Sequence, residues 1–157
     1  MPLQPERNYP PVILSGYIIL EKDSQVLMLR RFNTGYHDGD YSLPAGHLEA
    51  GEFASLGTVR EVAEEIGIIL KQQDITIAHI MHRLCDDHER VDFFFKPTKW
   101  NGTPRNVEPH RCDDASWFPL DKLPANIVPY VKVALEKYRS GEFYSEFSEA
   151  ENTVFTK

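Results

Sequence analysis

The stretch of residues 46–68, GHLEAGEFASLGTVREVAEEIGI, constrains the chain more than any other segment. Its apolar side chains repeat at the spacing of a helix with one buried face, and they are Leu56, Val59, Ala63 and Ile66. At about 100° per residue, three glutamates fall together on the opposite side of that helix. They are Glu61, Glu64 and Glu65, with Arg60 beside them. This segment therefore predicts a helix that displays a carboxylate cluster.

Carboxylates at this spacing destabilise a helix by about a few tenths of a kcal/mol per pair, so the cluster needs compensation. A fully solvated helix face is one interpretation of such a charge pattern. A hard divalent cation is the other. Mg²⁺ takes oxygen ligands and commonly works through a few carboxylates together with substrate phosphates, which matches a glutamate cluster without a full cage of protein ligands.

The spacing of the whole stretch favours the metal. Gly46 is followed after five residues by Glu52, and after seven more by Arg60-Glu61. The segment then ends in Val62, Ala63, Glu64-Glu65, Ile66, Gly67 and Ile68. This resembles the Nudix box, G-x5-E-x7-R-E-U-x-E-E-x-G-U with U aliphatic, at every defining position. The resemblance implies a Nudix hydrolase.

The resemblance also implies an α/β fold, the Nudix-type α/β/α sandwich with a mixed β-sheet and a catalytic loop and helix. Hydrophobic patterning agrees with this order of elements. Strands are predicted at 12–20, 25–31, 41–43, 75–84, 91–95 and 115–119, and a second helix at 127–138. The first two strands, separated by the polar residues 21–24, are predicted to form a hairpin.

A chain of 157 residues is the size of one domain with a single core. We expect a proline-rich arm at 1–11, the Nudix domain at 12–140, and an acidic and aromatic tail at 141–157 that the pattern does not assign to any structure.

The composition excludes several classes of partner. A net charge of −7 argues against general binding to nucleic acid or to anionic membranes. No apolar run approaches the roughly 18 residues of a membrane span, and the N-terminus lacks the layout of a signal peptide. Cys85 and Cys112 are too few for a disulfide framework. We expect a cytoplasmic protein that binds an anionic substrate through metal and arginine.

By resemblance, the metal ion is Mg²⁺, with Mn²⁺ as a possible substitute. Its ligands would be the Gly46 carbonyl, Glu61, Glu64 and Glu65. Arg60 would hold Glu52 or Glu61 in place through charge-assisted hydrogen bonds. Metal-bound water would attack the pyrophosphate bond.

The general base stays open at this stage. Family mechanisms place it on a box glutamate or on an acid from a later loop, so Glu61 and Glu108 are both candidates. Asp113 and Asp114 are further candidates for the loop acid.

Candidates for substrate binding lie outside the box. Arg30 and Arg31 end a predicted strand, and they are either a solvated strand end or a phosphate contact. Aromatic side chains in the loops 32–41 and 96–114 offer surfaces on which a base could stack. They are Phe32, Tyr36, Tyr41 and Trp100.

The predicted substrate is a nucleoside diphosphate linked to a group X. About 16 residues after the box, Nudix ADP-ribose hydrolases often carry a proline, and diadenosine polyphosphate hydrolases a tyrosine near there. This chain has Arg83, Leu84 and Cys85 instead. The difference favours a nucleoside triphosphate that yields monophosphate and pyrophosphate. The alternatives are an ADP-sugar or dinucleotide pyrophosphatase, and a nucleotide-binding Nudix module without catalysis.

Overall fold

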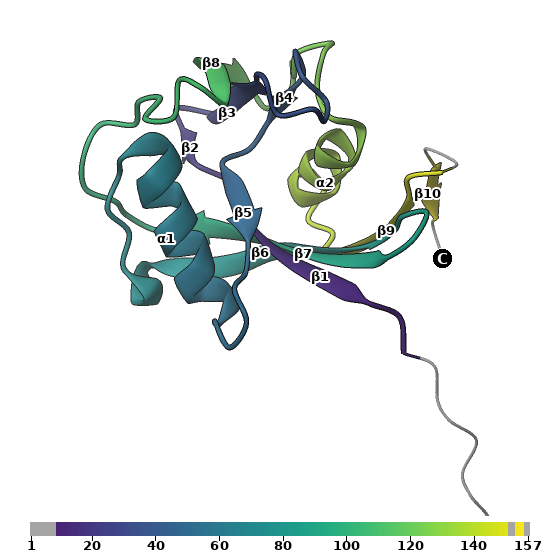
Figure 1. Ribbon diagram of the computed structural model, residues 1–157. Coiled ribbons are helices and arrows are strands. Elements are labelled where there is room, and N and C mark those ends of the chain that lie inside the picture. Colours follow the sequence, from purple (N-terminus) through teal and green to yellow (C-terminus); the bar gives the residue numbers. More distant parts are fainter. Residues whose placement is uncertain (1–8, 151–152, 156–157) are drawn as a thin grey trace, which may run out of the picture.

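The structure, a computed structural model, describes residues 9–150 and 153–155 (Figure 1). Its helices are α1 (Ala54–Ile66) and α2 (Pro129–Arg139), with a short 3-10 helix at Gln72–Asp74. Its strands are β1 (Val12–Ile18), β2 (Glu21–Lys22), β3 (Gln25–Arg31), β4 (Tyr41–Ser42), β5 (Ala45–His47), β6 (Ile75–Leu84), β7 (Glu89–Pro97), β8 (Cys112–Pro119), β9 (Tyr144–Ser148) and β10 (Thr153–Phe155). Most of the predicted arm, 1–8, lies outside the described residues.

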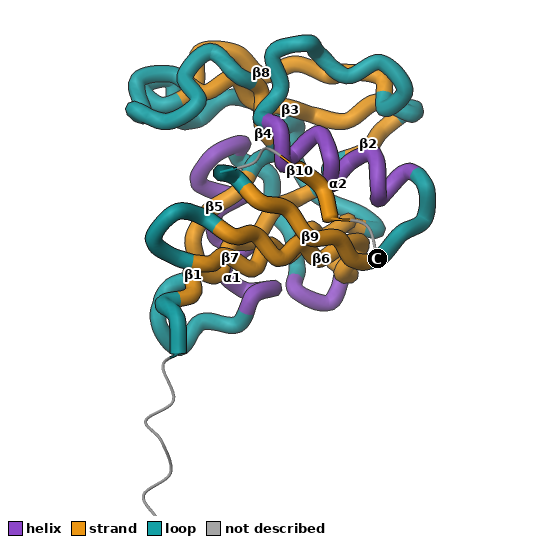
Figure 2. The backbone as a smooth tube through the Cα atoms, turned by 90° about the vertical axis from the view of Figure 1, so that its right-hand side faces the viewer, coloured by secondary structure: helices purple, strands orange, loops and turns teal. Residues whose placement is uncertain are grey.

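Two sheets organise these strands. The larger has the order β10-β9-β6-β7-β1-β5, and it is mixed because β1 runs parallel to β7 and β9 runs parallel to β6. The smaller contains β2, β3 and β4, with β8 paired to β3. In Figure 2, α2 lies between the smaller sheet and the larger one. The predicted mixed α/β fold is confirmed.

The predicted hairpin of 12–20 with 25–31 is wrong. β1 pairs with β5 and β7 in the larger sheet, and of the residues before the turn at 23–24 only Leu20 and the two-residue β2 bond to β3. The physical reason is that this segment is buried on both faces. Tyr17 and Ile19 pack into the core that contains α2, whereas Ile18 and Leu20 pack into the core that contains α1. A strand with two apolar faces needs a central position between helices.

Helix α1 presents a different face to the core than the apolar spacing predicts. Its buried residues are Gly57, Thr58, Val62 and Ile66, whereas Leu56 is 44% exposed. The cause is close packing on the sheet. A Cβ on Gly16 of β1 would lie 1.9 Å from the Thr58 hydroxyl oxygen, so small residues set the contact. This rotation turns the glutamates at 61 and 65 toward the sheet.

The C-terminal segment joins the larger sheet. α2 begins with Pro129 at its first turn, a position where proline costs no hydrogen bond, and it spans nearly the predicted 127–138. After it, β9 runs parallel to β6, with Leu84 opposite Ser148. The chain thereby brings Glu149 beside the end of β6. No helix in the described part of the chain is long and apolar enough to cross a membrane.

Candidate active site

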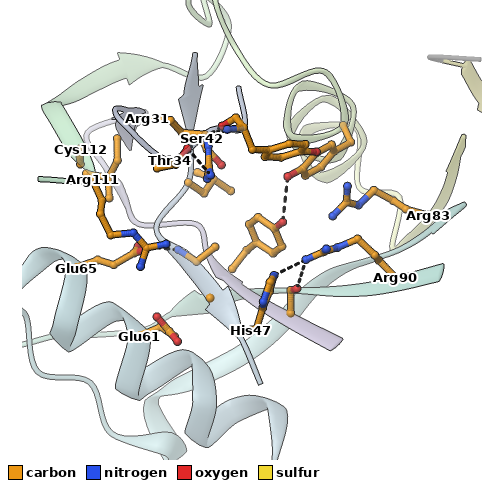
Figure 3. A pocket seen from close by; sticks show the side chains of 18 of the residues that line it. Arg31, Thr34, Ser42, His47, Glu61, Glu65, Arg83, Arg90, Arg111 and Cys112 are labelled. Atoms are coloured by element: carbon orange, nitrogen blue, oxygen red, sulfur yellow. Dashed lines mark hydrogen bonds between the residues drawn. The ribbon is translucent and has the colours of Figure 1, made fainter. Parts of the chain in front are cut away.

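A cavity of about 550 Å³ lies where α1, the larger sheet, β3 and α2 meet (Figure 3). Its lining is rich in charge. The acidic side chains are Glu61, Glu65, Glu108 and Glu149, and the arginines are Arg30, Arg31, Arg83, Arg90 and Arg111. In Figure 3, Glu61 and Glu65 lie at one end, and Arg83 and Arg90 lie at the other. We call these the acidic end and the arginine end.

The acidic end is built by β5 against α1. A Cβ on Gly46 would lie 1.9 Å from the carboxyl carbon of Glu61, so only glycine lets the backbone approach this carboxylate. One turn later, an oxygen of Glu65 accepts a hydrogen bond of 2.9 Å from the Ala45 amide. Both carboxylates are therefore held beside the backbone of 45–46.

Arg60 orients the carboxylates from behind. It donates to both oxygens of Glu52, at 2.9 and 3.0 Å, and to Glu61 at 2.7 Å. Glu64 lies 3.6 Å from the same guanidinium group and is 52% exposed. Hydrogen bonds from Arg60 and from the Glu49 amide lower the pKa of Glu52 to about 2. Neither Glu52 nor Arg60 lines the cavity. Arg60 contacts the lining residue Glu61, and Glu52 contacts Arg60.

The acidic end contains too little positive charge to compensate the negative charge of its carboxylates. Burial, with the nearby charges of Glu61 and Glu108, raises the pKa of Glu65 to about 8. Burial also raises the pKa of Glu61, and Glu64 and Glu108 add to this effect. Mutual repulsion of this kind is what a bound cation relieves.

The oxygen donors at the acidic end fit a magnesium ion. Among the described residues, no group of three or more His, Cys, Asp or Glu side chains is already arranged around a common metal position. Mg²⁺ does not need such a cage, because it keeps several waters and binds through one or two carboxylates plus substrate phosphates. Glu61, Glu65 and the Gly46 backbone provide that smaller set, whereas Glu64, the other predicted ligand, is exposed and does not line the cavity.

The arginine end is organised by a buried ion-pair network. Arg83 is 1% exposed, and its Nε donates to Asp92 at 2.5 Å. A second nitrogen of Arg83 donates to Glu149. The guanidinium group lies over the ring of Tyr130, 3.5 Å from its centroid. These contacts fix Arg83 as a rigid wall of the cavity.

Arg90 links this wall to the acidic end. Its Nη2 lies 3.1 Å from the Ser15 hydroxyl and 2.6 Å from Nε2 of His47, the residue after Gly46. Because Arg90 can only donate, His47 accepts at Nε2 and is neutral. Burial, followed by the charge of Arg90, lowers the pKa of His47 accordingly.

The loop after β3 contributes Thr34 and Tyr36 to the lining of the cavity. Arg31 donates from Nε to the Tyr36 carbonyl at 2.6 Å and from Nη2 to Thr34 at 3.1 Å. The hydroxyl of Tyr36 donates to Glu149 at 3.2 Å, so the loop contacts the segment after β9. Arg30 is paired with Asp113 at 2.7 Å.

The structure brings together some of the predicted site residues. Those that line the cavity are Gly46, Glu61, Glu65, Glu108, Arg30, Arg31 and Tyr36. Tyr41 and Trp100 do not line it. Tyr41 is buried, and its hydroxyl donates to Asp114 at 2.6 Å, while Trp100 packs against the core under α1. The proposed stacking role of these two rings is without structural support.

Several cavity residues were not singled out from the sequence. They are His47, Arg83, Arg90, Arg111, Tyr130 and Glu149. Arg83 carried a signal, because it is the one Asp, Glu, Lys or Arg in β6. Arg90 carried less, because Glu89, Asp92 and Lys96 share its strand. Arg111 lies in a polar loop and Glu149 in the tail, where no pattern distinguishes them from solvated residues.

Comparison with known proteins agrees with the box. The family description "NUDIX domain" matches residues 12–138. Similar relatives include an ADP-ribose pyrophosphatase of Methanocaldococcus jannaschii, 37% identical over 43% of this chain and 38% of that protein. Another is an NAD-capped RNA hydrolase NudC of Pseudomonas entomophila, 30% identical over 75% of this chain and 40% of that protein. The chain thus spans about two fifths of the length of these curated relatives.

Solved structures show the same fold over nearly their whole length. The MutT NUDIX hydrolase from Burkholderia pseudomallei superposes with a TM-score of 0.73 at 26% identity, covering 80% of this chain and 96% of that one. The box, the fold and the domain match lead to one conclusion: the chain belongs to the NUDIX family.

Proposed function

We propose that this protein is a metal-dependent hydrolase that cleaves a pyrophosphate bond in a nucleoside diphosphate linked to a group X. The observation that carries the proposal is the convergence of Glu61, Glu65 and Glu108 at one end of a cavity whose remaining charged lining is mostly arginine. Carboxylates hold the metal, and arginines compensate the phosphates that the metal does not reach.

Mg²⁺, or Mn²⁺ in its place, would be held by Glu61, Glu65 and the Gly46 carbonyl, with Glu64 joining them from the exposed side of α1. When bound, the ion would neutralise phosphate charge and lower the pKa of the attacking water. Arg111 lines the cavity near Glu65 (Figure 3), and this position supports a role in binding the phosphate that is attacked.

Glu108 is the preferred proton acceptor, and Glu61 is the alternative. The carboxylate of Glu61 is engaged by Arg60, whereas that of Glu108 has no hydrogen bond or ion pair with another described residue. In the reaction, the water oxygen bonds to phosphorus and its proton passes to Glu108. The bond from phosphorus to the bridging oxygen breaks, and the leaving phosphate keeps the electron pair.

Two substrate classes remain candidates. Residues 83–85 lack the proline of ADP-ribose hydrolases and the tyrosine of diadenosine polyphosphate hydrolases, and this difference favours a nucleoside triphosphate. Its products would be a nucleoside monophosphate and pyrophosphate. An ADP-sugar or dinucleotide is favoured by the names of the relatives, an ADP-ribose pyrophosphatase and an NAD-capped RNA hydrolase. A nucleotide-binding module without catalysis is the third reading. The complete box argues against it.

A substrate panel tests the proposal. Nucleoside triphosphates, ADP-sugars and dinucleotides are incubated with Mg²⁺, Mn²⁺ or EDTA, and products are identified by mass spectrometry. We expect metal-dependent release of a nucleoside monophosphate. Glu108→Gln should lower kcat by about 10²-fold or more while leaving Mg²⁺ affinity unchanged, because it removes a base and not a ligand. Orthophosphate as the first product of every triphosphate, or no turnover at all, would contradict the proposal.

A further inference from the structure

Two arginines stand directly opposite each other at the arginine end of the cavity. Arg83 of β6 is the antiparallel partner of Arg90 of β7, so their side chains leave the same face of the sheet. Like charges in such a pair are destabilising unless anions compensate them. Asp92 and Glu149 both bind Arg83. Within the described residues, Arg90 has no ion pair.

The same place holds unsatisfied polar atoms. Among the described residues, the buried side-chain nitrogens and oxygens without a hydrogen-bond partner are Nε of Arg90 and Nε2 of His88. Both residues line the cavity. The other ring nitrogen of His88 already contacts Asp87, at 2.6 Å. A buried polar atom left unpaired costs about 1–3 kcal/mol, so a ligand that supplied partners to both atoms at this cavity wall would gain binding free energy.

The position of Arg90 shows where that partner sits relative to the reaction. Through Ser15 and His47, Arg90 reaches across β1 to β5, next to Gly46. In Figure 3, Arg111 and Glu65 lie on one side of His47, and Arg90 and Arg83 lie on the other. When the diphosphate of the substrate lies at Glu61 and Glu65, Arg90 is therefore available to bind a different part of the same substrate molecule.

We propose that Arg90, with Arg83 and His88, binds a second phosphate group of the substrate, carried as a monoester outside the pyrophosphate that is cleaved. This inference rests on the proposed function. A guanidinium group presents several donors in a fixed plane that matches phosphate oxygens, and Arg90 keeps Nε free for one of them. Because Nδ1 of His88 faces the Asp87 carboxylate, Nε2 accepts from a hydroxyl when the ring is neutral and donates to a phosphate oxygen when it is protonated.

Matched substrates test this assignment. Coenzyme A and dephospho-coenzyme A share a cleavable pyrophosphate and differ by one phosphate monoester, and NADP⁺ and NAD⁺ differ in the same way. We expect wild-type kcat/KM to favour the phosphorylated member of at least one pair by about 10-fold or more. Arg90→Gln should abolish that preference, mainly by raising KM for the phosphorylated member about 10-fold more than for the unphosphorylated one. Arg139→Gln removes the same charge from an exposed site outside the cavity, and it should keep the preference.

Two results would overturn the inference: equal wild-type kcat/KM within each pair, or a preference that survives in Arg90→Gln. Failure of the proposed function looks different, because no pyrophosphate would then be cleaved in any compound. In that case, calorimetric binding of adenosine 3′,5′-bisphosphate and of AMP tests the second site alone. About 10-fold tighter binding of the bisphosphate to wild type, lost in Arg90→Gln, supports the site. Equal binding of the two nucleotides overturns it.

Discussion

The two ends of the cavity compensate their carboxylates in opposite ways. At the arginine end, Asp92 is fully buried and bound by Arg83, which also binds Glu149. At the acidic end, Glu65 has a backbone amide as partner, and its pKa is raised to about 8. A carboxylate with its cation built in needs no further partner, whereas one without it is available to an ion that arrives from solvent. The difference separates structural acids from those proposed for catalysis.

The largest expected effect comes from breaking the built-in pair. Asp92→Asn should lower the free energy of unfolding by about 3 kcal/mol, because it leaves Arg83 buried with only Glu149 as a charged partner. Urea denaturation followed by circular dichroism measures this. Asp113→Asn makes the same change at the exposed pair with Arg30 and should have little effect on stability. Equal losses in the two variants would show that burial does not distinguish these ion pairs.

Removing a carboxylate charge from the acidic end should lower activity without lowering stability. Glu65→Gln is expected to lower kcat by at least about 10²-fold, which corresponds to roughly 2.7 kcal/mol of barrier, while the metal-free fold stays intact or gains stability. We expect a comparable loss of kcat for Glu64→Gln, because the charge of Glu64 acts on Glu61 and Glu64 is a proposed metal ligand. Steady-state kinetics in Mg²⁺ measure both losses of kcat. A Glu65→Gln variant with the kcat of the wild type would refute the metal assignment.

The contrast between the two ends also explains what sequence reasoning reached. Gly46, Glu61 and Glu65 were found because one continuous segment carries them at a characteristic spacing. Even there, the buried face of α1 was only partly predicted, since Ile66 is buried but Leu56 and Ala63 are exposed, and Gly57 and Thr58 are buried in their place. Periodicity records hydrophobicity, but small residues decide how closely two elements approach.

The arginine end depends on register between distant strands. Arg83 and Arg90 face each other only because β6 and β7 pair in one particular alignment, and Glu149 reaches them only because β9 joins the sheet beside β6. A single sequence contains no local pattern for such pairings. Tyr41 shows the opposite error, since a loop position suggested exposure whereas pairing with β3 buries the ring.

The raised pKa of Glu65 gives the acidic end a distinct pH dependence. Its ordinary value is 4.5. Between about pH 4.5 and 8, the folded protein therefore holds a proton on Glu65 that the unfolded chain has already released. The stability from this proton is complete below the lower value and is lost as the pH rises through 8. In EDTA, Tm should therefore fall by about 2–4 °C per pH unit between 6 and 8. Thermal melts of Glu65→Gln should lack this slope, and an identical slope in both proteins would exclude Glu65 as its source.

The smallest expected effect concerns the contact between the loop after β3 and the arginine end. Tyr36→Phe removes the hydroxyl that donates to Glu149, a hydrogen bond exposed enough to contribute only about 0.5 kcal/mol. We expect KM to rise by about 2-fold with kcat unchanged, because the loop borders the cavity without touching the proposed metal position. Tyr144→Phe removes an equivalent exposed phenol-to-carboxylate bond, to Glu146 at 3.0 Å, away from the cavity, and should leave KM unaltered. If both variants change KM equally, the loop contact does not shape the site. If Tyr36→Phe lowers kcat instead, then closure of the loop contributes to the chemical step, and the two ends of the cavity are coupled through Glu149.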